Sequence, residues 1–567
     1  MSTIALSLNF ANFDKEKYEK YPVSEAIERM YEDKMIFLQN YDTKTLIVID
    51  NYNVDADDEF HRFTSGNYKV IFTSREKHDE NVILVESMEE NQDLLALFRK
   101  YHDDEDTKLL TDDEPMVLNI IQLVLGHTMT VMLIAAAMRV NGITPSDMYA
   151  RLKNSLNPDL ERLIGVDKEE ISAKVRNQVM YQHVLNLFDM ERFSINDDEN
   201  EAFTGIMTNM AIVPFDGLEI DELCSWAFAE RNEDVVFDDF MKLVKLRWVQ
   251  YDEDSKQVSL HPVISEVAAD KLKPDSENCS GLLEAYTQLE EVSSGRTYVE
   301  QLNYCINTLE LSYKRINDVT LLTARLLYTF GYSNLTMVNC QIALECYNKL
   351  ISLLIELIEK THDEGGLILY KCFLLDAYGH KGNACEEMRA FDEAITAISK
   401  AIEIGEYLHS VSKNTGLDMR VELAKAYQNR GVVYEYMKRH NDALLDKNKS
   451  IALLEQVIKD EISDAEDSLA NAYMNRASTY DKLDRFDEGQ TDTEKSIEIW
   501  ERMKAEGKKI NESGYLKAKA NRSYGKFRIF SEKSKKRLSN EGASIEARAM
   551  RNTMLEYRKK QLNGGNK

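Results

Sequence analysis

The sequence predicts a mostly α-helical protein that has a small α/β segment at its N-terminus and an α-solenoid of helical hairpins in its second half. All seven prolines lie at or before Pro274, so the second half can form one helix after another. A short motif recurs there every 46 residues, which is typical of a helical-repeat array. Near the N-terminus, short apolar runs end in polar residues, as buried parallel strands do.

The N-terminal segment is expected to contain one helix and three strands. The helix is predicted over residues 23–38, and the strands over Thr45–Asp50, Lys69–Thr73 and residues 82–86. The first of these strands is a continuous apolar run, so we expect a central strand that is covered on both faces.

Helical periodicity dominates residues 89–140 and 160–193, and residues 198–272 combine helices with two short strands, Arg247–Tyr251 and Gln257–Leu260. A further helix is predicted to begin at Pro262, because proline is favoured at a first helical position. Helices followed by a terminal hairpin indicate a winged helix. Lys273–Gly281 is the best candidate for a linker.

The repeat is clearest around a pair of polar residues. Ala426–Gly431 (AYQNRG) recurs 46 positions later as Ala472–Ala477 (AYMNRA), and Asn521-Arg522 follow after another 46. Small residues recur twelve positions apart, and we expect them to let the two helices of a hairpin approach closely: Gly331/Ala343, Gly382/Ala394, Gly431/Ala443 and Ala477/Gly489. This unit resembles the tetratricopeptide repeat over about five copies from Leu321 to Phe530, although its period of 46–51 exceeds the usual 34.

Two strand ends could carry nucleotide chemistry. TLIVIDNYN resembles a Walker B strand, in which Asp50 would reach a Mg²⁺ ion and its waters, with Asn51 beside it. KVIFTSR has the composition of a sensor strand, with Arg75 available to a phosphate oxygen. The structural alternatives are a buried strand that ends in Asp and a surface arginine that closes a strand.

Gly126, in LGHTM, and His261, in LHPVI, complete the set in the right order. Together the four segments resemble the NB-ARC-like proteins of the STAND class of P-loop ATPases. The resemblance implies a partial P-loop NTPase-like domain (1–86), a helical domain (87–193), a winged helix (194–273) and a repeat solenoid (282–567). It also implies ADP or ATP with Mg²⁺, with Gly126 lining the adenine pocket and His261 at the β-phosphate; the alternative for His261 is a structural residue between strand and helix.

No Walker A motif, G-x-x-x-x-G-K-[ST], occurs in the sequence. Without its amide cradle and lysine, strong nucleotide binding and efficient ATP hydrolysis by this chain are not expected. We therefore expect either a start that is placed too late or a truncated nucleotide domain, and the cofactor only if the missing loop is present upstream.

Charge and composition exclude several partners. Residues 1–275 carry 54 acidic and 28 basic side chains, which disfavours nucleic acid, whereas residues 517–567 carry a net charge of +11. This basic segment could touch nucleic acid or an acidic protein, or be a solvated helix face. Seven unpatterned cysteines, no signal peptide and no membrane-length apolar run indicate a cytoplasmic protein.

The leading interpretation is a signal-transduction regulator, in which an NB-ARC-like ADP/ATP switch is coupled to repeats that bind a protein or peptide and in which self-association is possible. One alternative is a repeat scaffold with a vestigial nucleotide domain. Another is a winged-helix transcription regulator, which is disfavoured because that module offers few basic residues: Lys242, Lys245 and Arg247. Six residues are predicted to contact the peptide, unless they only pair within the solenoid: Asn429, Arg430, Asn475, Arg476, Asn521 and Arg522.

Overall fold

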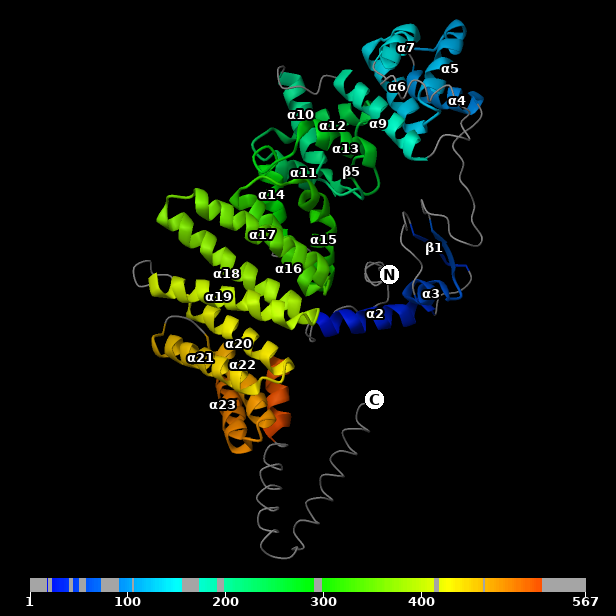
Figure 1. Cartoon of the computed structure of the whole chain (residues 1–567). Coiled ribbons are helices and arrows are strands. Elements are labelled where there is room, and N and C mark those ends of the chain that lie inside the picture. Colours follow the sequence, from blue (N-terminus) through cyan, green and yellow to red (C-terminus); the bar gives the residue numbers. More distant parts are fainter. Residues whose placement is uncertain are drawn as a thin grey trace, which may run out of the picture. The chain divides into compact units, whose positions relative to one another are not determined.

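The computed structural model describes residues 18, 23–39, 44–49, 58–72, 91–104, 107–154, 173–190, 198–289, 298–411, 418–461 and 465–522. The chain divides into two compact units, residues 1–337 and 338–567 (Figure 1). The described part is mostly helical, as the sequence predicts, and contains little sheet. The four domain boundaries given above stay a prediction.

The first unit begins with two short parallel strands and two helices: α2 (Val23–Gln39), β1 (Leu46–Ile49), α3 (Asp58–Thr64) and β2 (Lys69–Phe72). Ile49 belongs to the apolar core that α2 and α3 form, and Phe72 packs against that core. Side chains alternate along a strand, so the opposite face carries Leu46, Val48 and Ile71, which are 52%, 63% and 53% exposed. The expectation that β1 is covered on both faces is therefore wrong. The third predicted strand lies outside the described residues.

The predicted helical region after the strands is confirmed where the structure describes it; residues 160–172 of the prediction lie outside the described residues. The described part comprises a short 3₁₀ turn, η2 (Thr111–Asp113), and the helices α4 (Asn91–His102), α5 (Glu114–Leu123), α6 (Thr128–Asn141), α7 (Pro145–Asn154) and α9 (Ala173–Met190). Helix α6 ends at Gly142, whose φ of 60° is left-handed, a common way for a helix to end.

Residues 198–289 form a small α/β region. Its elements are α10 (Asp198–Met210), β3 (Leu218–Glu219), α11 (Ile220–Ala227), α12 (Glu233–Lys245), β4 (Gln250–Asp252), β5 (Gln257–Ser259), α13 (Pro262–Leu272) and α14 (Ser280–Thr287). The hairpin β4–β5 and the start of α13 at Pro262 are confirmed. Strand β3 escaped prediction because it is only two residues long; it pairs antiparallel with β5, so the sheet order is β3-β5-β4.

The predicted linker is wrong, because residues 273–281 are packed against their surroundings. The Ser276 hydroxyl donates to Asp318, and Cys279 is only 1% exposed. A Cβ atom on Gly281 would lie 2.4 Å from the carbonyl oxygen of Trp226, so only glycine fits there. Helices α15 (Tyr298–Arg315) and α16 (Leu321–Thr336) complete the first unit.

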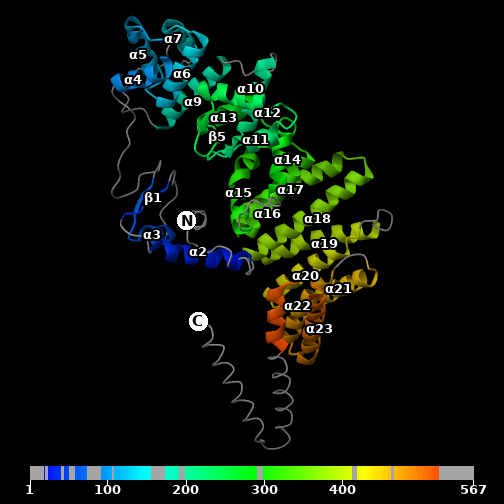
Figure 2. The same ribbon diagram turned by 180° about the vertical axis from the view of Figure 1, so that it is seen from behind.

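The second unit is a stack of antiparallel helices. They are α17 (Cys340–Lys360), α18 (Glu364–Glu387), α19 (Phe391–Val411), α20 (Arg420–Tyr436), α21 (His440–Lys459), α22 (Glu466–Lys482) and α23 (Phe486–Ala505), followed by a helix over residues 512–522. Each helix from α17 to α23 packs against the next one along the chain (Figures 1 and 2). The pairs α18–α19, α20–α21 and α22–α23 are successive hairpins, so the predicted solenoid is confirmed over these helices, whereas α16, which was predicted to belong to it, lies in the first unit.

The turns inside the hairpins share one backbone conformation. Arg389, Lys438 and Asp484 occupy equivalent positions and have left-handed φ angles of 60°, 62° and 59°. Each turn therefore reverses the chain within a few residues, without glycine.

Small residues hold the two helices of each hairpin close together, as predicted. Ala394 and Ala443 are completely buried. A Cβ atom on Gly382 would lie 2.3 Å from Ile398 Cγ1, and one on Gly431 would lie 3.2 Å from Lys447 Cγ. A Cβ atom on Gly489 would lie 3.1 Å from the carbonyl oxygen of Ala477. Larger residues would push these helices apart.

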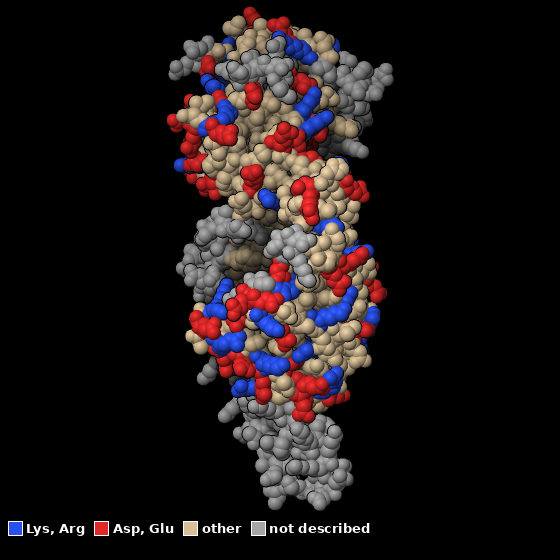
Figure 3. Space-filling model, turned by 90° about the vertical axis from the view of Figure 1, so that its left-hand side faces the viewer, with Lys and Arg blue, Asp and Glu red and all other residues tan. Residues whose placement is uncertain are grey.

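The surface of the solenoid carries mixed charge. Figure 3 shows basic and acidic side chains interspersed over one of its faces. Among the helices that the structure describes, none is long and apolar enough to cross a bilayer.

Candidate functional site

The first helices of the hairpins, α18, α20 and α22, are linked by amide side chains. Asn429 donates from Nδ2 to Asn383 Oδ1 at 2.9 Å, and Asn475 donates from Nδ2 to Gln428 Oε1 at 3.3 Å. We call these four residues the amide row. Asn429 and Asn475, which the sequence predicted as ligand contacts, thus each bridge two neighbouring first helices, and the two bridges start from the adjacent residues Gln428 and Asn429 of α20.

The amide row keeps unused hydrogen-bonding capacity. A primary amide has two N–H donors and an oxygen that accepts, and each contact above uses one donor and one acceptor. Gln428 Nε2 is buried and has no hydrogen-bond partner within the described chain. A buried donor without a partner is costly, so this amide is not held in place by a full set of hydrogen bonds.

The arginines of the repeated motif form ion pairs inside the hairpins. Arg430 binds Asp446 through two parallel hydrogen bonds of 2.7 and 2.9 Å, and Arg476 binds Asp492 at the same two distances. Asp446 and Asp492 are 3% and 4% exposed. Arg430 and Arg476 therefore pair within the solenoid, which was the alternative to the predicted contact with a peptide.

Sequence reasoning missed the aspartates, although a signal existed. Each of them follows its arginine by 16 positions, and the two arginine–aspartate pairs are 46 residues apart, as the repeat requires. Asn521 and Arg522, the third copy of the motif, are partly buried on the helix 512–522. Their predicted role in binding is untested.

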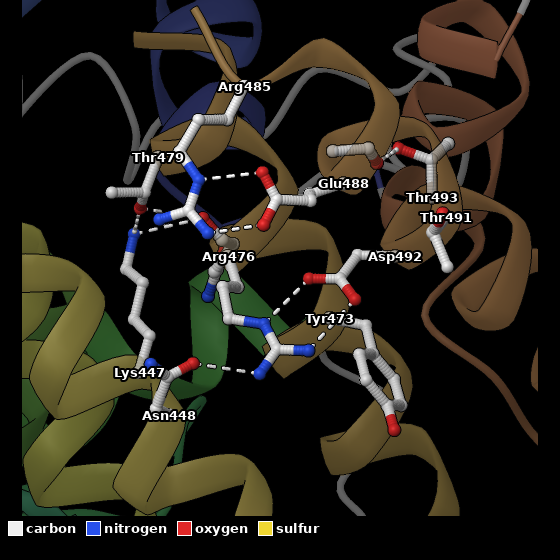
Figure 4. A network of polar contacts seen from close by, with 12 residues as sticks. Lys447, Asn448, Tyr473, Arg476, Thr479, Arg485, Glu488, Thr491, Asp492 and Thr493 are labelled. Atoms are coloured by element: carbon white, nitrogen blue, oxygen red, sulfur yellow. Dashed lines mark hydrogen bonds and ion pairs between the residues drawn. The ribbon is translucent and has the colours of Figure 1, made fainter. Parts of the chain in front are cut away.

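A buried lysine joins two successive hairpins. Lys447, on α21, is 1% exposed, and its Nζ donates to Glu435 Oε1 (2.7 Å), Thr479 Oγ1 (2.9 Å) and the carbonyl oxygen of Asn475 (3.0 Å) (Figure 4). Lys482 also binds Glu435, at 2.8 Å. Burial lowers the pKa of Lys447. Burial also opposes ionisation of Glu435, but Lys447 and the donated hydrogen bonds hold the pKa of this carboxyl below its usual value.

The predicted nucleotide-binding residues are only partly described. Asp50, Asn51 and Arg75 lie outside the described residues. Gly126 is buried and has a left-handed φ of 68°, which glycine adopts readily. His261 caps the N-terminus of α13, where its Nδ1 accepts a hydrogen bond from the Val263 N–H at 3.3 Å.

The structure brings the segments of Gly126 and His261 together. His127, next to Gly126, stands at the N-cap position of α6; burial, and then the charge of His261, lower its pKa to about 4. The residues at the N-termini of α6 and α13 therefore lie within electrostatic range of each other. Sequence reasoning missed His127, whose signal was its position beside Gly126.

Two of the three basic residues considered for nucleic acid binding in the small α/β region already contact other side chains. Lys242 lies 3.1 Å from Asp239, and the Arg247 guanidinium lies 4.8 Å from the ring centre of Tyr101. Among the described residues, no group of histidine, cysteine and acidic side chains could hold a metal ion.

Comparison with known proteins identifies repeats in the second unit. Residues 375–404 and 470–499 match the Tetratricopeptide repeat family. These ranges fall on the hairpins α18–α19 and α22–α23, so the chain contains tetratricopeptide repeats. No curated protein matches the chain.

Several solved structures are similar to parts of this chain. The crystal structure of MamA is 20% identical and covers 36% of this chain and 92% of its own, with a TM-score of 0.25. Aspartyl phosphate phosphatase F from Bacillus subtilis is 12% identical over 57% of this chain and 70% of its own, with a TM-score of 0.31. A STAND protein with a tetratricopeptide repeat sensor from Pyrococcus horikoshii is 14% identical over 92% of this chain and 77% of its own, with a TM-score of 0.27. Similarity at this level does not indicate a shared function.

Proposed function

We propose that the chain is a protein-interaction protein whose solenoid binds an extended segment of a partner. The observation that carries this proposal is the amide row, which crosses the first helices of consecutive hairpins. Stacked helical hairpins offer long surfaces rather than closed pockets, and such surfaces suit elongated ligands. An amide side chain carries the same donor and acceptor as a peptide group, so the row can pair with a partner's main chain.

The first prediction concerns Asn429 and Asn475. We expect the double substitution Asn429→Ala, Asn475→Ala to abolish the enrichment of binders from a phage-displayed library of random dodecapeptides selected against the full chain. The melting temperature should change little, because each amide makes only one side-chain contact along the row. Selection and thermal melting on the same preparations would measure both effects.

A matched control is available on the second helices. Asn348 and Asn441 are exposed amides on α17 and α21. Asn348→Ala with Asn441→Ala should leave the selection unchanged. If the row variant unfolds, or selects the same peptides as the wild type, the amide row is structural and the proposal fails.

We also propose a second function for the first unit, namely a nucleotide-dependent switch of the NB-ARC-like kind that regulates signalling through the repeats. The proximity of His127 and His261 at two helix N-termini favours it, because such an arrangement attracts an anion such as a phosphate. ADP or ATP would bring the phosphate, and Mg²⁺ would be held by Asp50. The missing Walker A loop limits this proposal to weak binding by the present chain.

The second prediction follows from that limit. We expect isothermal titration calorimetry of the full chain with ADP to show no sub-micromolar binding, because no amide cradle is present for the phosphates. Weak binding, if measured at millimolar protein, should disappear in His261→Ala. Sub-micromolar binding by the wild type would contradict the prediction and show that other residues hold the phosphates.

A further inference from the structure

Two glutamates occupy equivalent places in successive hairpins. Glu386 on α18 and Glu435 on α20 both follow the close-packing glycine of their helix, Gly382 or Gly431, by four positions. Each glycine faces the same position of the second helix, because a Cβ atom on it would lie nearest to Ile398 in one hairpin and Lys447 in the other. The environments of the two carboxyl groups can therefore be compared directly.

The carboxyl group of Glu435 is neutralised, and that of Glu386 is not. The carboxylate of Glu435 forms ion pairs with Lys447 and Lys482 and accepts a hydrogen bond from the Thr479 hydroxyl. At the corresponding positions around Glu386 the chain has Ile398, Tyr436 and Val433. Glu386 makes no side-chain hydrogen bond or ion pair with any described residue, and burial and then Glu387 raise its pKa to about 7.

A second unpaired carboxyl group lies on the same face of α18. Asp376, Gly379, Asn383 and Glu386 are spaced three to four residues apart, so they share one side of the helix, and we call them the α18 strip. Asp376 is partly buried and has no ion pair or side-chain hydrogen bond within the described chain. Burial, and then Glu422 of α20, raise its pKa to about 6, whereas Lys425 opposes this shift.

The α18 strip is open and continuous with the amide row. A Cβ atom on Gly379 would meet nothing within 4 Å, so the helix surface is open at this position of the strip. Asn383 belongs to both surfaces, because it accepts the hydrogen bond from Asn429. A segment that pairs with the amide row would thus pass the two carboxylates.

We propose that the α18 strip receives basic side chains, so that the partner segment is a lysine- or arginine-containing peptide. This inference rests on the function proposed above. The bound cation supplies from outside the positive charge that Lys447 and Lys482 supply at Glu435. The face of the solenoid that Figure 3 shows carries both signs, so on that face there is no uniform acidic surface that would attract a basic peptide non-specifically.

The experiment compares three fluorescein-labelled dodecapeptides, of alternating Lys-Ala, Glu-Ala and Ser-Ala, by fluorescence anisotropy with the full chain at pH 8 and 150 mM salt. The Lys-Ala peptide should bind the wild type most tightly. Asp376→Asn with Glu386→Gln should weaken its binding at least tenfold, since two charge-assisted contacts are lost. The same variant should melt at a higher temperature than the wild type, because carboxyl groups with raised pKa values destabilise the fold when they ionise above pH 7. Weaker binding by a more stable protein cannot result from unfolding.

A control with the same net charge excludes non-specific attraction. Glu359 and Glu403 are exposed on the second helices α17 and α19, so Glu359→Gln with Glu403→Gln should bind the Lys-Ala peptide like the wild type. Equal binding by the strip variant and the wild type would overturn this inference. If only the Glu-Ala or Ser-Ala peptide binds, this inference fails and the proposed function survives; if none binds, the proposed function fails as well.

The basic C-terminal segment of the chain itself is the competing occupant. Reversing its charge with Lys535→Glu, Lys536→Glu and Arg537→Glu in the full chain should leave the affinity for the Lys-Ala peptide unchanged. A tenfold rise would show that the segment already fills the α18 strip, and would overturn the assignment to a separate partner.

Discussion

Replacing Lys447 by methionine is expected to lower the free energy of unfolding by about 3–5 kcal/mol. Methionine fills the space beside Gly431 but leaves the buried Glu435 with Lys482 as its remaining cation, and the carbonyl oxygen of Asn475 without the lysine. Urea denaturation followed by circular dichroism would measure the change.

The matched control for Lys447 is Lys449, two positions further along α21. Lys449 is exposed and lies 4.9 Å from the ring centre of Tyr427, so Lys449→Met should cost no more than about 1 kcal/mol. Adding Glu435→Gln to Lys447→Met should recover part of the loss, because the buried carboxylate that lost its lysine is then removed as well. Equal effects of the two single substitutions would mean that Lys447 is hydrated.

Arg476→Met is expected to cost about 3 kcal/mol or more, because it leaves the carboxylate of Asp492 buried without its partner. The side chains of this pair are 16% and 4% exposed. Figure 4 shows it beside a second arginine pair, Arg485 with Glu488, whose side chains are 43% and 49% exposed.

The second pair provides the control. Arg485→Met breaks an ion pair of the same chemistry at the surface, where water replaces the lost contact, so we expect at most about 1 kcal/mol. Thermal and urea unfolding of both variants would test the difference. A similar cost for both would show that burial does not decide the strength of these pairs.

The solenoid could be predicted because the small residues that allow its helices to pack closely recur at a short, fixed spacing in the sequence. Gly382, Ala394, Gly431 and Ala443 recur at one spacing, and small residues at that spacing have a single explanation, the close approach of paired helices. The role of Arg430 could not be predicted from its own position. An arginine on a first helix can face a ligand or reach back to the second helix, and only the position of Asp446 decides between them.

Prediction was weaker where polar residues are buried. Lys447 stands where the neighbouring hairpin has Ile398, and a lysine at an apolar position normally indicates a surface site. Its burial depends on Glu435, Thr479 and Asn475, which come from two other helices. In the first unit, Gly126 and His261 were expected to contact a nucleotide, which stays a prediction; His127, beside Gly126, feels the charge of His261. Asp50, Asn51 and Arg75 stay predictions.

The Lys447 network has a consequence for the cooperativity of the array. In a stack where each helical hairpin contacts mainly its neighbours, stability is a sum of hairpin terms and junction terms. The network joins α20, α21 and α22 through ionic contacts, whereas at the preceding hairpin Ile398 fills the position of Lys447. Protonation of Glu435 therefore weakens the α21–α22 junction selectively. In acid the solenoid would separate at that junction into two cooperative blocks, whereas at neutral pH the same contacts make it unfold as one.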